Sequence, residues 1–68
     1  MNVYKCYFYK DNGVTKEACV EFVASHRELT ANEIKNRLYE ESPYNEPETV
    51  IEHLKVYRQM IVNDIEVL

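Results

Sequence analysis

Two runs of aromatic and β-branched residues flank the only glycine of the chain, and this pattern constrains the fold more than any other. The runs cover residues 3–10 and 14–24, and the turn-forming segment Asp11-Asn12-Gly13 lies between them. Such runs joined by a short Asn-Gly segment are typical of an antiparallel β-hairpin. The sequence therefore predicts that the first third of the chain folds as a hairpin.

The register of this hairpin decides which side chains are buried. A two-residue Asn12-Gly13 turn would mix apolar and acidic residues on one face. A three-residue loop over 11–13 separates the two kinds better, and register follows the buried face. We therefore predict the three-residue loop, with an apolar face formed by Tyr4, Cys6, Phe8, Ala18, Val20 and Phe22. The opposite, polar face then carries Val3, Lys5, Tyr7, Tyr9, Thr15, Glu17, Cys19 and Glu21.

This register places Cys6 and Cys19 on opposite faces, so that a disulfide between them is not expected. Residues 1–6 lack the apolar core of a signal peptide, and no apolar run approaches the roughly 20 residues of a membrane span. Two cysteines in a cytosolic chain are expected to be free thiols. The sequence thus predicts a cytoplasmic protein with reduced cysteines.

A helix is expected after the hairpin. Thr30 and Glu33 have the spacing of a capping box, and Leu29 and Ile34 have that of a hydrophobic staple. A helix over residues 31–41 should follow, ending at Ser42-Pro43 because the residue before proline disfavours helical geometry.

A second helix is expected from about residue 45, because four apolar residues recur at helical spacing: Val50, Ile51, Leu54 and Tyr57. Residues 60–68 fit either a continued helical stripe or a strand, and we favour the strand because a lone hairpin is marginal in water. The predicted fold is a single α+β domain over residues 1–68. In it an antiparallel hairpin and a third, C-terminal strand pack on two helices, in the order β-β-α-α-β.

No catalytic or metal-binding set is visible. The candidate metal ligands are Cys6, Cys19, His26 and His53, and none of them forms the close pair that zinc sites use. A Cys19–His26 nucleophile pair would need a third orienting group and a pocket, which a chain of 68 residues can hardly provide. No glycine-rich loop leads into a helix, so a phosphate cradle is not expected. We predict a non-enzymatic protein without cofactors.

Tyr7 and Tyr9 are the first candidate for a binding surface, because they lie on the polar face of the predicted hairpin. They could pack under another segment of the chain, anchor a protein partner, or stack nucleic-acid bases together with Lys5 and Lys16. The net charge of −4 argues against nucleic acid, since phosphate binding needs cations. A protein partner is the preferred interpretation, with nucleic acid as the alternative.

The second candidate is an acidic stretch over residues 40–52. Its charged residues are Glu40, Glu41, Glu46, Glu48 and Glu52, without an intervening Lys or Arg. Such a stretch could dock into a basic groove of a partner. It could equally stabilise a helix N-terminus and keep a small protein soluble.

The strand segment Val20-Glu21-Phe22-Val23-Ala24, followed by Thr30-Ala31-Asn32-Glu33, is similar to the strand-then-helix pattern of small accessory proteins of bacteriophages and mobile elements. The resemblance covers about half of the chain. It implies a regulator or inhibitor that acts by stoichiometric contact. We therefore expect a protein-interaction module. The oligomeric state stays open, and a homodimer is an energetic possibility because so short a chain buries only a small core.

Overall fold

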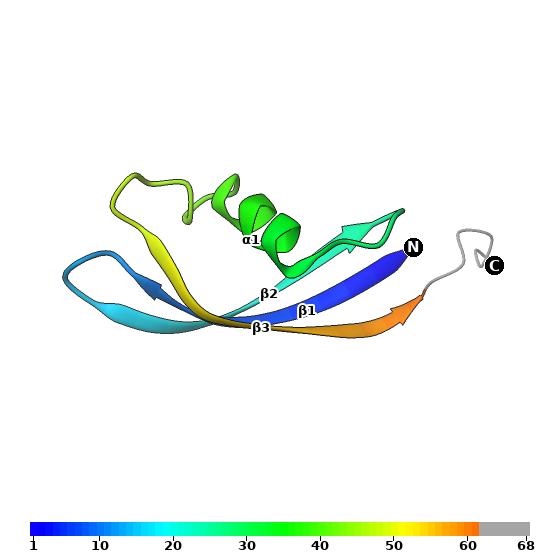
Figure 1. Cartoon of the computed structure of the whole chain (residues 1–68). Coiled ribbons are helices and arrows are strands. Elements are labelled where there is room, and N and C mark those ends of the chain that lie inside the picture. Colours follow the sequence, from blue (N-terminus) through cyan, green and yellow to red (C-terminus); the bar gives the residue numbers. More distant parts are fainter. Residues whose placement is uncertain (62–68) are drawn as a thin grey trace.

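Three strands and one helix make up the part of the chain that the structure describes. The computed structural model describes residues 1–61, and the side chains of residues 1–59. The elements are β1 (Asn2–Asp11), β2 (Lys16–Ser25), α1 (Ala31–Tyr39) and β3 (Val50–Ile61). The strands form one antiparallel sheet of order β2-β1-β3, so that the N-terminal strand is the central one. This is a small α+β fold of two layers (Figure 1).

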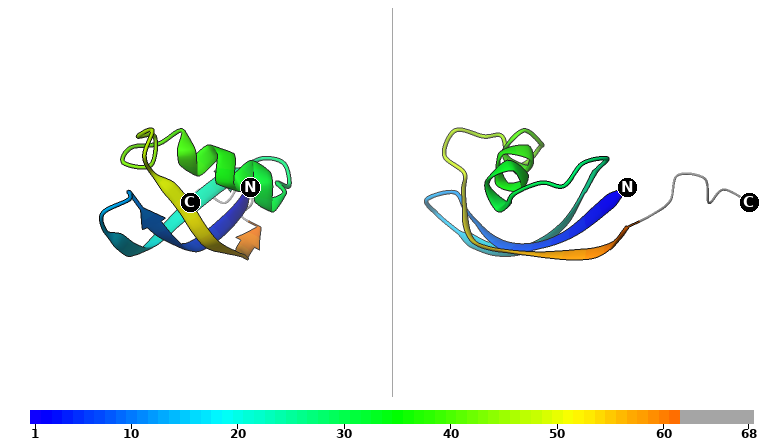
Figure 2. Two further views of the ribbon diagram at one scale, coloured as in Figure 1. Left: turned by 60° about the vertical axis from the view of Figure 1, so that its left-hand side comes forward. Right: turned by 45° about the vertical axis from the view of Figure 1, so that its right-hand side comes forward.

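The core lies between α1 and one face of the sheet, which we call the inner face. Its buried apolar side chains come from all four elements and two connections: Tyr4, Cys6, Phe8, Val23, Leu29, Ile34, Leu38, Tyr44 and Ile51. The connections on either side of α1 lie on the same side of the sheet as the helix (Figure 2). The other face of the sheet, the outer face, is therefore not covered by any segment in the described range (Figure 1).

The hairpin closes through a four-residue loop over residues 12–15, and the predicted three-residue loop is wrong. Strand pairing ends at Asp11 and Lys16. The side-chain oxygen of Asn12 accepts hydrogen bonds from the backbone N–H groups of Val14 and Thr15, at 2.9 and 2.8 Å. Gly13 has φ +88°, the left-handed region that glycine adopts without steric cost. Asn12 and Gly13 thus form the turn, but in a longer loop than expected.

The longer loop reverses the predicted facing of β2. Tyr4 pairs with Val23, Cys6 with Glu21 and Phe8 with Cys19. Since side chains alternate along a strand, a change of register by an odd number of residues moves every side chain of β2 to the other face. Val20 and Phe22, which were predicted to be buried, lie on the outer face with exposed fractions of 49% and 61%.

Glu21 takes an inner-face position because a partner there satisfies its carboxylate. The hydroxyl of Tyr44 donates a hydrogen bond to Glu21 Oε2 at 2.6 Å. The Tyr44 ring also packs edge-on against Phe8, with centroids 5.2 Å apart. The predicted placement of Glu17 and Glu21 beside Tyr7 and Tyr9 is therefore wrong.

The two cysteines share the inner face, which also contradicts the predicted register. Cys6 is fully buried in the centre of β1, and Cys19 is partly buried on β2. Both are free thiols. Cys6 pairs with Glu21, two residues along β2 from Cys19, so the cysteines are diagonal neighbours and not directly opposed.

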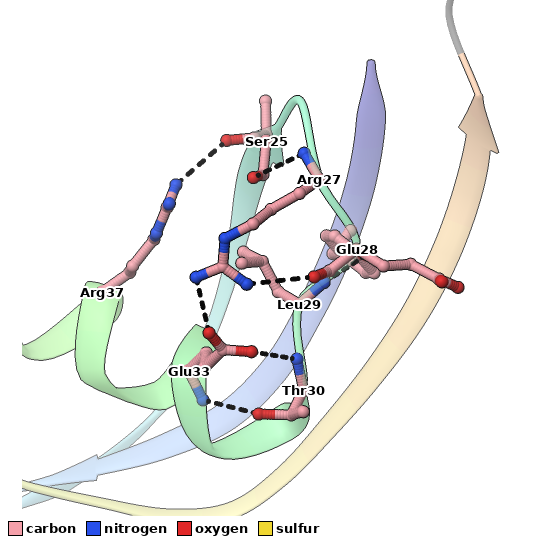
Figure 3. A network of polar contacts seen from close by, with 9 residues as sticks. Ser25, Arg27, Glu28, Leu29, Thr30, Glu33 and Arg37 are labelled. Atoms are coloured by element: carbon pink, nitrogen blue, oxygen red, sulfur yellow. Dashed lines mark hydrogen bonds and ion pairs between the residues drawn. The ribbon is translucent and has the colours of Figure 1, made fainter.

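The start of α1 confirms the predicted capping box. The Thr30 hydroxyl accepts from the Glu33 N–H at 3.2 Å, and Glu33 Oε1 accepts from the Thr30 N–H at 2.9 Å (Figure 3). Leu29 and Ile34, the predicted staple residues, are both buried. The helix ends at Tyr39, two residues before the predicted end.

The predicted second helix is wrong. Residues 40–49 form turns, and Val50 begins a strand, so the order of elements is β-β-α-β. The helical spacing arises from a β-bulge in β3. The register with β1 shifts between Tyr7 and Tyr9, opposite His53 and Leu54. The bulge adds one residue, so that Ile51 and Leu54, three apart, both contact the core. Three-residue spacing is also helical spacing, which explains why Ile51 and Leu54 resembled a helical stripe.

The third strand of the sheet begins at Val50, in the segment for which a helix was predicted, and ends at Ile61. The predicted strand over residues 60–68 lies outside the described residues from position 62 onward. Within the described range, no helix has the length and apolar character that crossing a membrane requires.

Candidate functional site

The outer face of the sheet carries an exposed cluster of large apolar side chains from all three strands. We call these residues the aromatic patch: Tyr7 and Tyr9 on β1, Val20 and Phe22 on β2, and Tyr57 on β3. Phe22 is 61% exposed and Tyr57 is 52% exposed. Single exposed apolar residues are ordinary, but contiguous apolar patches mark interaction surfaces. The patch is therefore the candidate site.

The six tyrosines divide by face. On the helix side of the molecule, each tyrosine hydroxyl is used within the fold. Tyr4 accepts from the Leu29 N–H at 3.0 Å and Tyr39 accepts from the Ile51 N–H at 2.8 Å, while Tyr44 donates to Glu21. On the outer face Tyr7, Tyr9 and Tyr57 have no hydroxyl hydrogen bond to any part of the chain that the structure describes. These three side chains thus expose both a ring and a hydroxyl on the outer face.

The outer rings hold one another in place. Tyr7 and Tyr57 meet edge-on with centroids 5.8 Å apart. The Lys5 ammonium lies 5.2 Å from the Tyr7 ring centroid and 5.8 Å from that of Phe22, within the range of cation–π attraction. Because these contacts restrict the rings before any partner arrives, less conformational entropy is lost on binding.

A depression of about 370 Å³ opens between Tyr7 and Tyr9. Its walls include the small side chain of Ala18 on β2 and that of His53 on β3. His53 has φ +55°, a left-handed conformation that costs energy for any residue with a Cβ. Its ring meets Tyr9 edge-on at 6.1 Å. The bulge therefore directs His53 towards the patch, as bulges at binding sites do.

The charge on the outer face differs from the expectation. Lys5, Lys16 and Lys55 lie there, whereas Glu17 and Glu21 take inner-face positions. The acidic residues of the outer face are at its end near the hairpin loop, where Glu52 lies 3.7 Å from Lys16. The patch is thus apolar with basic residues among its rings and acidic residues towards one end.

The predicted acidic site does not form one surface. Glu40, Glu41, Glu46 and Glu48 follow α1 on the helix side of the sheet, whereas Glu52 is on the outer face beside Tyr9. The four residues on the helix side are exposed. Because the sheet separates them from Tyr7 and Tyr9, they do not belong to the aromatic patch.

The sequence-based prediction placed Tyr7, Tyr9 and Lys5 on this face and missed three contributors: Val20, Phe22 and Tyr57. The first two were assigned to the core by the wrong register, and the third to a helix. Lys16 was named as a possible nucleic-acid contact, but the predicted register did not place Lys16 on this face. The length of the loop could have been found from Asn12, whose side chain bonds to two following N–H groups and so favours a wider turn.

The four candidate metal ligands, Cys6, Cys19, His26 and His53, do not form a metal-binding group in the part of the chain that the structure describes. Burial, and secondly the nearby Glu21 carboxylate, raise the pKa of the Cys6 thiol. Cys6 is accordingly a protonated core residue. Among residues 1–59 no three side chains of His, Cys, Asp or Glu lie close enough to hold a metal ion.

Comparison with protein-family models, with curated proteins and with solved structures finds no significant match to this chain. The geometry of the outer face is therefore the basis for inferring the function.

Proposed function

We propose that the protein is a non-enzymatic interaction module that docks a protein partner on its aromatic patch. The observation that carries the proposal is the division of the tyrosines: three satisfy their hydroxyls within the fold, and three expose ring and hydroxyl on a face that the described residues leave uncovered. Tyrosine is enriched at protein interfaces because it offers large contact area and a polar tip at small entropic cost.

Two further features support a protein partner. The rings are held by the contacts to Lys5 and between Tyr7 and Tyr57, so that the surface is preorganised. The depression beside Tyr9 offers a recess of the kind in which interface anchor residues sit. We propose further that the protein acts in the cytoplasm as a stoichiometric regulator or inhibitor, of the kind that bacteriophages and mobile elements encode.

Site-specific photo-crosslinking tests the proposal. A benzophenone amino acid is placed at Phe22, in the patch, and as a matched control at Asn36, which is exposed on α1. After irradiation in the native cells we expect a covalent adduct of discrete mass from position 22 and not from position 36. Equal labelling at the two positions, or no adduct from position 22, would contradict a docking role for the outer face.

Single-stranded nucleic acid is the second candidate, and one observation favours it. Lys5, Lys16 and Lys55 share the outer face with three tyrosines, and Glu17 and Glu21 do not lie among them. Basic residues interleaved with aromatic rings are the pattern of sequence-tolerant single-strand binding. A gel-shift series with a single-stranded oligonucleotide separates the candidates: binding at low salt that disappears at high salt, and in Tyr7→Ala, supports nucleic acid.

A further inference from the structure

We infer that the partner on the aromatic patch is a second copy of this chain, packed outer face to outer face about a two-fold axis. This inference rests on the proposed function and names the partner. It follows from the order of side chains along β2 and from the charges at the two ends of the patch.

Three successive side chains in the middle of β2 increase in size along the outer face. Ala18, Val20 and Phe22 pair with Tyr9, Tyr7 and Lys5 respectively, so that they occupy three successive levels of the outer face. In a two-fold interface the same patch meets itself, and each contact occurs twice. The two-fold axis lies between the two outer faces, perpendicular to the strands and at the level of Val20. Rotation about this axis reverses the direction of the strands. It therefore carries Phe22 of one copy over Ala18 of the second copy.

This arrangement places the protruding Phe22 ring of one copy against the depression beside Ala18 of the other copy. Phe22 is the most exposed aromatic residue of the patch, at 61%, and Ala18 lines the depression beside Tyr9. Val20 then meets Val20 of the second copy on the axis. Val20 and Phe22, the two large apolar residues of β2 that a single chain leaves exposed, are thus covered by the dimer, which adds burial that so short a chain lacks.

The charges agree with the same axis. Lys5 lies at the level of Phe22, and Glu52 pairs with Tyr9 at the level of Ala18. Rotation about the axis brings Lys5 of each copy to the end that carries Glu52 of the other copy. Lys55 pairs with Tyr7 and so lies at the level of the axis, where it faces Lys55 of the second copy. One like-charge pair is therefore a built-in cost of this dimer.

The shape of the sheet limits the contact to its middle. Both ends of the sheet curve towards α1, so that the outer face is convex along the strands (Figure 1, Figure 2). Because convex faces meet only at their middle, we expect this contact to be smaller than the roughly 800 Å² per partner of a standard interface. We therefore expect a dissociation constant on the order of micromolar, and measurements must extend to about 500 μM of protein.

Sedimentation equilibrium of the purified chain is the first measurement, and the wild type should be a dimer at high concentration. Phe22→Ala removes the protrusion and Ala18→Phe fills the recess, so each variant alone should dimerise about tenfold or more weakly. Both positions are exposed, and circular dichroism verifies that each variant folds. Lys55→Gln removes the like-charge pair and should dimerise about two- to fivefold more tightly.

An equimolar mixture of the two weakened variants gives the decisive measurement. In a mixed dimer Phe22 of the Ala18→Phe chain meets the open Ala18 of the Phe22→Ala chain. At the second of the two equivalent contacts, the phenylalanine introduced by A18F meets the alanine introduced by F22A. We therefore expect an equimolar mixture to form heterodimers with an affinity within about threefold of the wild type, although each variant alone is monomeric at the same concentration.

Several results would overturn the inference while leaving the proposed function standing. A wild type that stays monomeric at about 500 μM, single variants with unchanged affinity, or a mixture that stays monomeric each exclude this arrangement. In those cases an adduct of a different protein at position 22 would still support docking. Loss of oligonucleotide binding in the patch variants, without any change in mass, would assign the face to nucleic acid.

Discussion

Tyr44 shows how one hydroxyl allows an acidic side chain on the inner face of the sheet. It donates to Glu21 Oε2 at 2.6 Å, and its ring packs on Phe8. Burial, and secondly the bond to Glu21, raise the pKa of Tyr44 well above its ordinary value of 10. Without this partner, the half-buried carboxylate of Glu21 would have no hydrogen-bond donor among the described residues.

Replacing Tyr44 by Phe keeps the ring contact and removes only the hydrogen bond. We expect the free energy of unfolding to fall by about 1–2 kcal/mol, because a hydrogen bond to a charged group is lost. Urea denaturation measures this change in the free energy of unfolding. Tyr9→Phe is the matched control, since its exposed hydroxyl has no partner among the described residues, and it should change stability by less than about 0.5 kcal/mol. Equal effects of the two changes would contradict this role.

The raised pKa of Tyr44 also predicts a loss of stability in alkali. The folded-state pKa lies above the ordinary value of 10, so the contribution is fully present below pH 10 and is lost as the pH rises beyond it. Unfolding should therefore require less urea above pH 10 in the wild type. The Cys6 thiol, whose pKa is also raised, titrates in both proteins, so the difference between wild type and Tyr44→Phe isolates the tyrosine. If the difference in stability between the wild type and Tyr44→Phe does not change with pH, the raised pKa of Tyr44 does not contribute to stability.

At the scale of the element, a polar network fixes the start of α1. Arg27 Nη2 lies 2.6 Å from Glu33 Oε2, while the other Glu33 oxygen accepts from the Thr30 N–H (Figure 3). The Arg37 guanidinium donates to the Ala24 carbonyl at 3.4 Å, which connects the helix to the end of β2. The network sets where the helix begins, and thereby which residues, Ile34 and Leu38, face the core.

Glu33 makes this network sensitive to acid. The hydrogen bond from Arg27, and secondly that from the Thr30 N–H, lower its pKa from 4.5 to about 2. A lowered folded-state pKa stabilises the fold above the ordinary value, and this contribution is lost as the pH falls from 4.5 to about 2. Acid titration followed by circular dichroism should show a steeper loss in the wild type than in Glu33→Gln. Identical acid profiles would rule out this role.

The backbone of His53, in the bulge of β3, is strained, and this strain can be measured. His53 adopts φ +55°, and a side chain in that region costs about 1–2 kcal/mol, whereas glycine does not incur that cost. We expect His53→Gly to be at least as stable as the wild type in dilute solution. Lys55→Gly, in the extended part of the same strand, should be about 1 kcal/mol less stable. Urea denaturation compares them, and a larger loss at position 53 than at 55 would contradict the assigned conformation.

At the scale of the whole molecule, the fold is a single helix on one face of a three-stranded sheet, and all its described connections lie on the helix side or at the strand ends. One core therefore supports the entire described structure. Cys6 lies at its centre, between the two edge strands, and is fully buried, whereas Cys19 is only partly buried on edge strand β2.

Thiol labelling measures how cooperatively this core opens. Under native conditions we expect a maleimide reagent to modify Cys19 readily. Cys6 should react only through global unfolding, because opening the central strand disrupts the sheet on both sides and burial raises the pKa of its thiol. Mass spectrometry of the time course, with Cys19→Ser to isolate Cys6, gives both rates. Equal rates for the two thiols would mean that the centre of the sheet opens without global unfolding.

Local patterns in the sequence determined the hairpin, the turn around Gly13, the capping box at Thr30 and Glu33, and the candidates Tyr7 and Tyr9, because each depends on residues that are neighbours in the chain. Tertiary contacts decided the rest. The hydroxyl of Tyr44, 23 residues from Glu21, made an inward glutamate acceptable, and pairing with β1 turned the helix-like spacing of β3 into a bulged strand. The face of the sheet that Phe22 occupies depended on those distant partners, and so did the position of the aromatic patch.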